Sequence, residues 1–213
     1  PNFNPNNRSD MTPEHFRNRS VTDVFEPGST VKPFTISMAL ASGRFSVETP
    51  VSTSPGIHYV GRDPVRDIHD YGDLTLGGVL IKSSNVGTAK VAMELAPEEL
   101  YGILDKVGFG QATGIELPGE VGGSLLKRER WRPIEHATLS FGYGLSSTQV
   151  QLARAYAVLA SGGMLRPVTL KHKSGAVPGK RVLSDQTTRQ INALLEEVVS
   201  AQGTAKRAVV PAY

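Results

Sequence analysis

A serine and a lysine lie one helical turn apart in the segment EPGSTVKPF, residues 26–34. The hydroxyl of Ser29 can attack a carbonyl carbon, and the amine of Lys32 can accept the hydroxyl proton if the amine is itself unprotonated. Residues three apart share a face of a helix, and burial can lower the pKa of a lysine toward neutrality. The spacing therefore predicts a serine nucleophile with a lysine base, although a helix cap followed by a solvated lysine has the same spacing.

A second polar group, Ser83-Ser84-Asn85, supports the catalytic interpretation. It lies at a break between two helical patterns, where a turn can direct a hydroxyl and a carboxamide into a cleft. For this triplet alone, an Asn-stabilised loop between helices is the alternative. The order Ser-x-x-Lys and then Ser-x-Asn is the known signature of β-lactamases and penicillin-binding proteins, so the two motifs together favour acyl transfer through a serine.

Apolar spacing predicts the elements that position these groups. We expect helices over residues 29–41, 74–82, 86–95, 97–107, 148–160 and 184–201. We expect a strand over residues 165–170, and Ser184 is the expected N-cap of the last helix. Turn residues predict an extended or loop segment over residues 1–20, a surface insertion with short β-like pieces over residues 43–73, and irregular structure over the glycine-rich residues 109–144.

The composition limits the size and the partners of the domain. The 213 residues are 39% hydrophobic, which suffices for the core of one globular domain with room for a helical subdomain. The formal net charge of +3 is spread along the chain, so no nucleic-acid partner is expected. No apolar run approaches the roughly 18 residues of a membrane-spanning helix, and these residues by themselves are expected to be soluble.

No metal or cofactor site is expected. The chain has no cysteine, which excludes disulfides, thiolate catalysis and cysteine-type zinc sites. No two histidines lie at metal-ligand spacing, and His58, His69, His136 and His172 are expected at the surface or in loops. No glycine-rich nucleotide-binding motif follows a predicted strand. Trp131 lies in a basic stretch and is expected to anchor a loop.

Four stretches of the chain resemble the class B penicillin-binding proteins, most closely their division-specific septal transpeptidases in Gram-negative bacteria. These are PNFNPNN at residues 1–7, RNRSVTDVFEPGSTVKPF at 17–34, IKSSNVG at 81–87 and LSFGYGLSSTQVQLARAYAVLASGG at 139–163. The resemblance runs through essentially the whole chain. It implies the α/β fold of serine β-lactamases and penicillin-binding transpeptidases, in which an antiparallel sheet is flanked by helices and an all-helical subdomain carries Ser83 and Asn85.

The same resemblance implies a D,D-transpeptidase that cross-links peptidoglycan at the division septum and is a target of β-lactam antibiotics. Its substrate would be a stem peptide ending in D-Ala-D-Ala, and β-lactams would be covalent inhibitors. By motif, Ser29 would be the nucleophile and Lys32 its general base. Ser83 would relay a proton to the leaving group, and Asn85 would bind the amide backbone of the substrate. The backbone N–H of Ser29 would form part of the oxyanion hole.

Three further residues lie near these motifs, and two of them have a plain alternative interpretation. In the segment FGYG, residues 141–144, Phe141 and Tyr143 would line the substrate cleft by the resemblance, whereas a buried core tyrosine is the plain alternative for Tyr143. Glu26 lies three residues before the nucleophile and could tune Lys32, or it could be a surface carboxylate.

By the resemblance, residues 1–213 are a partial transpeptidase domain. An upstream membrane-spanning helix, a non-catalytic pedestal and a third motif, Lys-Ser/Thr-Gly, would lie outside them. We expect that motif just beyond Tyr213 and reject the literal match Lys173-Ser174-Gly175, which sits in a turn-rich stretch before the last predicted helix. The natural protein would then be anchored in the inner membrane and act in the periplasm with divisome membrane proteins.

Two other functions remain compatible with the sequence. A β-lactam-binding sensor or scaffold would be acylated without turning over, and a serine β-lactamase would hydrolyse its acyl-enzyme. Transpeptidase and hydrolase share Ser-x-x-Lys, and they differ mainly in whether a positioned base activates the deacylating water.

Overall fold

The computed structural model describes residues 6–7, 9, 12–175 and 177–210, so most of the stretch PNFNPNN and the end of the chain at residues 211–213 lie outside the described residues. The helices are α1 (Arg19–Thr22), α2 (Lys32–Ala41), α3 (Leu76–Ile81), α4 (Asn85–Met93), α5 (Pro97–Val107), α6 (Pro133–Ser140), α7 (Gln149–Ala160) and α8 (Asp185–Val198). Short 3-10 helices are η1 (Pro13–Phe16), η2 (Gly28–Val31), η3 (Arg128–Arg130) and η4 (Lys206–Ala208).

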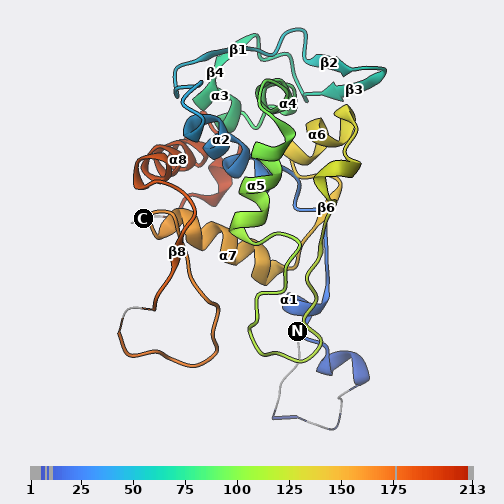
Figure 1. Ribbon diagram of the computed structural model, residues 1–213, viewed down its shortest axis with the longest axis vertical. Helices are drawn as coiled ribbons and strands as arrows, with labels where there is room; N and C mark the ends of the chain where they lie inside the picture. The colour runs from blue at the N-terminus through green and yellow to red at the C-terminus, as the bar shows by residue number, and fades with distance from the viewer. Residues whose placement is uncertain (1–5, 8, 10–11, 176, 211–213) are drawn as a thin grey trace.

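Among the described residues, strands pair only in twos, and every pair is antiparallel. The pairs are β1 (Pro50–Ser52) with β4 (Asp73–Thr75), β2 (Ile57–Val60) with β3 (Asp63–Arg66), β5 (Ser124–Leu125) with β6 (Leu145–Ser146), and β7 (Met164–Leu165) with β8 (Lys180–Arg181). In Figure 1 the strands β1 to β4 lie at one end with α3 and α4, and the long loops that precede α6 and follow α7 project from the other end. The predicted insertion with short strands at residues 43–73 is confirmed.

Helix α2 forms the centre of the body, where α3, α4, α5 and α8 all contact it. All residues from 32 to 39 are buried, because the sequence KPFTISMALA offers no wide polar face to water. The ring of Phe34 makes edge contacts with Phe109 at 5.8 Å and with Tyr156 of α7 at 5.6 Å between ring centroids. The residues just before α2 are therefore held on a rigid support.

Side-chain caps fix where several helices begin. Ser184 accepts a hydrogen bond from the Thr187 N–H, as the sequence predicts, and Ser84 does the same for Gly87 at the start of α4. Each cap satisfies one of the backbone donors that a helix start leaves without an intrahelical acceptor. The cap at Ser84 starts α4 within the Ser-Ser-Asn triplet, shortly after α3 ends at Ile81.

The structure corrects three expectations about the elements. Residues 109–144 are not wholly irregular, because α6 forms between their glycine-rich parts, with Pro133 in its first position and the Glu135 carboxylate accepting from the Arg132 N–H. Residues 1–20 are not wholly extended, since η1 and the start of α1 lie there. The strand expected at 165–170 is wrong beyond Leu165, where Pro167 has no N–H to donate to a ladder.

One histidine also differs from expectation. His136 is buried on α6 and stacks on Trp131 with 5.9 Å between ring centroids. Trp131 anchors its loop as predicted, because its indole N–H donates to the Leu126 carbonyl at 2.8 Å. His136 is thus a packing residue.

We predict that Phe34→Ala lowers the free energy of unfolding by about 3–5 kcal/mol, since the change leaves a cavity under the start of α2. The measurement is a urea titration followed by circular dichroism. Phe16→Ala is the control, because Phe16 is 74% exposed and its loss should change the stability by less than about 0.5 kcal/mol. Equal effects of the two substitutions would contradict the central place of α2.

Candidate active site

Lys32 and Ser83 are in direct contact, although 51 positions separate them in the sequence. Lys32 Nζ donates to Ser83 Oγ at 3.0 Å and also to the Ser83 carbonyl oxygen. Ser83 has a φ of +55°, in the left-handed region that non-glycine residues seldom occupy. Backbone strain of this kind persists only where the surroundings enforce it, and here it presents both oxygens of Ser83 to the lysine amine.

The Lys32 side chain is fully buried, which changes its chemistry. Burial lowers the pKa of Lys32 from 10.5 to about 8, and the negative charge of Asp67 opposes that change. Desolvation is the larger effect because the ammonium loses its hydration on burial. An amine with this pKa is partly unprotonated near neutral pH and can accept a proton.

Ser29 is exposed and lies on the short helix η2, which ends just before Lys32. Ser29 and Ser83 line one cavity of about 180 Å³, whose walls also include Thr30, Leu80 and Tyr156. None of the described residues hydrogen-bonds to Ser29 Oγ, so the structure brings Ser29 to the cavity without pairing its hydroxyl to the Lys32 amine. The backbone of residues 28–31 therefore decides where the Ser29 hydroxyl points.

That backbone is held by the segment FGYG. The Gly28 N–H donates to the Gly142 carbonyl at 3.0 Å, and Gly142 has a φ of +87°. A Cβ on Gly142 would lie 2.0 Å from the Gly28 carbonyl oxygen, so only glycine fits at this crossing. Glu26 also binds this segment, with its Oε1 accepting from the Gly144 N–H at 2.9 Å.

Asp67 is a functional residue that the motifs did not reveal. Its carboxylate accepts hydrogen bonds from the N–H groups of Asn85 at 2.5 Å and Val86 at 3.0 Å, and from the Ser84 hydroxyl. A carboxylate is favoured there because the N-terminus of α4 presents free N–H groups and a positive dipole end. Asn85 Nδ2 donates to the Arg66 carbonyl at 3.0 Å, which ties the triplet to the end of β3.

Asp67 rather than Glu26 is thus the carboxylate that acts on Lys32. The idea that Glu26 tunes the lysine is wrong, since its side chain serves the backbone of Gly144 instead. The contact of Asp67 with α4 joins residues 17 to 19 positions apart, and Asp67 itself follows β3 in a segment that carries no motif. The sequence alone held no signal for it.

The two aromatic residues of FGYG have different surroundings. Tyr143 is 51% exposed, whereas Phe141 is buried and packs with Val86, Ala89 and Ala137 between α4 and α6. Their ring centroids lie 5.9 Å apart at 65°. Tyr143 can therefore offer a surface to a ligand, and Phe141 supports it from the core.

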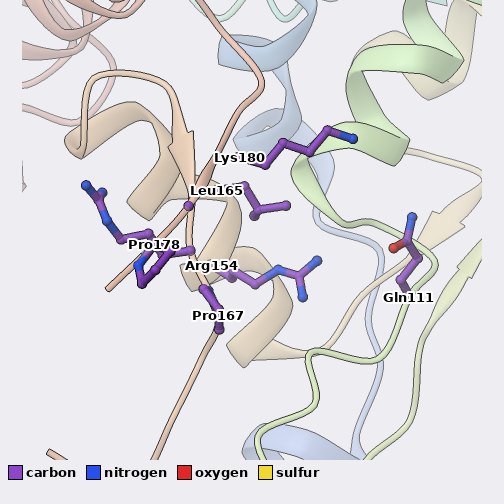
Figure 2. A pocket seen from close by; sticks show the side chains of 8 residues that line it. Gln111, Arg154, Leu165, Pro167, Pro178 and Lys180 are labelled. Atoms are coloured by element: carbon purple, nitrogen blue, oxygen red, sulfur yellow. The ribbon is translucent and has the colours of Figure 1, made fainter. Parts of the chain in front are cut away.

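A second cavity is larger than the one that Ser29 and Ser83 line. A cavity of about 480 Å³ is lined by residues of α7, the turn at Gln111 and the loop between β7 and β8, among them Arg154, Pro178 and Lys180 (Figure 2). Neither Ser29 nor Ser83 lines it. Lys173 and Ser174 lie in an exposed loop and line neither cavity, in accord with the rejection of Lys173-Ser174-Gly175 as the third motif.

No group of three or more histidine or acidic side chains among the described residues could hold a metal ion. None of the helices in that part of the chain combines the length and the apolar character needed to cross a membrane.

Known proteins resemble this chain along its whole length. Residues 1–213 match the family described as penicillin binding protein transpeptidase domain. The chain is 40% identical to the probable peptidoglycan D,D-transpeptidase PenA of Neisseria meningitidis and to the peptidoglycan D,D-transpeptidase FtsI of Escherichia coli K12. Each match covers 100% of this chain and 36% of the relative, so the chain spans about a third of these relatives.

Solved structures agree with these matches and confirm the fold expected from the resemblance. The TP domain of Burkholderia pseudomallei penicillin-binding protein 3 is 47% identical with a TM-score of 0.89, over 92% of this chain and 60% of that one. A Burkholderia ambifaria protein titled as a peptidoglycan glycosyltransferase is 44% identical with a TM-score of 0.90, over 92% of this chain and 63% of that one.

We predict that Asp67→Asn lowers the pKa of Lys32 further below about 8, because the negative charge that favours the ammonium is lost. An NMR titration of the ¹³C-labelled lysine side chain measures this. Glu26→Gln is the matched control and should leave the Lys32 pKa unchanged. A Lys32 pKa that moves only in the Glu26 variant would refute the assignment.

Proposed function

Because the chain belongs to the penicillin binding protein transpeptidase domain family, we propose that the protein carrying it is a peptidoglycan D,D-transpeptidase of the division-specific type. The observation that carries this proposal is the cavity shared by Ser29 and Ser83, with the amine of Lys32 buried against Ser83. These groups supply a nucleophile, a base and a proton relay, which acyl transfer requires.

In the acylation step, Ser29 Oγ attacks the carbonyl carbon of the penultimate D-Ala of a stem peptide. The neutral amine of Lys32 takes the hydroxyl proton. The Ser83 hydroxyl, which already accepts a hydrogen bond from Lys32 Nζ, gives its proton to the nitrogen of the departing D-Ala and takes the proton held by Lys32 in its place, which returns Lys32 to the neutral amine. An amine of a neighbouring stem peptide then attacks the acyl-enzyme, which forms the cross-link and regenerates Ser29.

Substrate binding and charge stabilisation fall to neighbouring groups. The N–H of Ser29 lies in the first turn of η2, where backbone donors lack intrahelical acceptors, and it is suited to a developing oxyanion. Asn85, held by Asp67 and Arg66, is suited to the amide backbone of the stem peptide. Tyr143 would offer its exposed ring to the substrate or to a β-lactam side chain, with Phe141 behind it.

We also propose that the natural protein is anchored in the inner membrane and acts in the periplasm with division proteins of the membrane. The relatives named FtsI and PenA are much longer than this chain, which leaves room for an anchor and a pedestal. This part of the proposal is supported by the resemblance alone.

A β-lactamase is the less favoured alternative for a structural reason. Hydrolysis of the acyl-enzyme needs a base that activates water, and none of the described residues that line the cavity of Ser29 is acidic. A slowly deacylated enzyme is therefore expected. A β-lactam sensor would also be deacylated slowly. It differs from a transpeptidase in that it does not cross-link stem peptides.

We predict that labelled penicillin attaches to Ser29 of the natural protein and that Ser29→Ala abolishes the adduct while the melting temperature stays within a few degrees. Mass spectrometry of the peptide containing residues 29–32 measures the adduct. An adduct that persists in the Ser29 variant would sink the assignment. Loss of the adduct within seconds would indicate a β-lactamase, and a lasting adduct without cross-linked stem peptides would indicate a sensor.

We predict that Lys173→Ala leaves penicillin acylation unchanged, because Lys173 lies in an exposed loop away from the cavity of Ser29. Substitution of the lysine in a Lys-Ser/Thr-Gly motif beyond Tyr213 should instead lower the acylation rate strongly, by about 100-fold or more, as expected for lost transition-state contacts. The rate of labelling by a fluorescent penicillin tests both. Failure of the Lys173 variant alone would show that the third motif is misplaced.

A further inference from the structure

Tyr156 connects α7 to the nucleophile turn. Its hydroxyl donates to the carbonyl oxygen of Thr30 at 3.0 Å, across 126 positions of sequence. Thr30 directly follows Ser29, and the Tyr156 side chain lines the same cavity as Ser29 and Ser83. Tyr156 lies in the stretch at residues 139–163 that resembles the family, and the catalytic motifs discussed above assign it no role.

The carbonyl that Tyr156 binds lies where the helix lacks a donor. In a continued 3-10 helix, the Thr30 carbonyl would accept from the N–H of residue 33, and Pro33 has no N–H. On the other side of the turn, Thr30 Oγ1 donates to the Pro27 carbonyl at 2.7 Å. The Tyr156 hydroxyl therefore completes the set of contacts that fix the backbone on both sides of Ser29.

The Tyr156 ring is itself held firmly. It makes an edge contact with Phe34 at 87° between ring planes. The side chain of Thr148 caps the N-terminus of its helix, α7. Burial raises the pKa of Tyr156 to about 12, so near neutral pH the hydroxyl keeps its proton and serves as a donor. This state suits a fixed hydrogen bond and does not suit a general base.

We propose that Tyr156 is a positioning residue for acyl transfer: its hydroxyl holds the Thr30 carbonyl and thereby orients Ser29 in the cavity shared with Ser83. The inference rests on the proposed function, since it assigns Ser29 as the nucleophile. Tyr156 acts on Ser29 through the backbone of Thr30, because Ser29 Oγ makes no hydrogen bond with Tyr156 or with any other described residue. Small displacements of a reacting group can cost up to about 100-fold in rate.

The test uses Tyr156→Phe in the natural full-length protein, a change that keeps the ring against Phe34 and removes only the hydroxyl. Stopped-flow acylation with a fluorescent penicillin separates the dissociation constant of the first complex from the acylation rate constant. We expect the rate constant to fall about tenfold and the dissociation constant to stay the same. The pH at half-maximal acylation should also stay the same, because Lys32 remains the base.

Tyr101→Phe is the matched control, since Tyr101 lies on α5 against Trp131 and does not line the cavity. It should leave both constants unchanged. An unchanged acylation rate constant in a correctly folded Tyr156→Phe protein would overturn the inference. A shifted pH profile would also overturn it, because it would make Tyr156 part of the proton transfer.

A second readout does not depend on activity. Hydrogen exchange at the amides of residues 29–31 should be faster in Tyr156→Phe than in the wild type and in Tyr101→Phe. If the wild type is not acylated at all, the proposed function fails, and this exchange experiment still decides whether Tyr156 fixes the turn. Unchanged exchange would refute the positioning role by itself.

Discussion

The chemistry that we propose for this domain depends on keeping one lysine amine out of water. An exposed lysine is an ammonium at neutral pH and has no lone pair with which to accept a proton. Lys32 is fully buried, and its Nζ contacts the two oxygens of Ser83, while Asp67 acts on it only through its charge. The effect of desolvation exceeds that of Asp67, so the pKa falls to about 8 and a base becomes available.

The turn that carries Ser29 is held in place by contacts between remote segments. The residues before α2 run beside residues 140–147, with Phe25 and Ser147 exchanging both backbone hydrogen bonds at 3.0 Å. Further along, the Gly28 N–H binds the Gly142 carbonyl, and Thr35 Oγ1 donates to the Ser140 carbonyl at 2.6 Å. Most of these contacts join backbone atoms. The backbones of Gly28 and Gly142 can approach this closely only because Gly142 has no Cβ.

Local patterns in the sequence predicted much of this arrangement. They did not predict the contacts between residues that are far apart in the sequence. The placing of Ser29 and Lys32 at the start of one helix and the Ser184 cap depend on spacing within one or two turns, so periodicity and capping rules predict them. Asp67 and Tyr156 act on residues from other elements, and each looks ordinary in its own segment, as a loop carboxylate or as one face of an amphipathic helix. Helix α6 escaped because its flanking glycines suggested irregular structure over the whole region.

The burial that makes Lys32 a base also lowers the stability of the fold. Proton linkage gives the direction in which this effect changes with pH. The lysine has a pKa of 10.5 when unfolded and about 8 when folded. Between these values the unfolded chain binds more protons at this site, so stability rises with pH across this window. Below about pH 8 both states are protonated, and the folded state bears the full cost of a buried ammonium, about 3 kcal/mol. The apolar packing of α2 must offset this cost at neutral pH. If that packing loosened and water reached Lys32, the local penalty would shrink, the pKa would return toward 10.5, and the domain would lose its base.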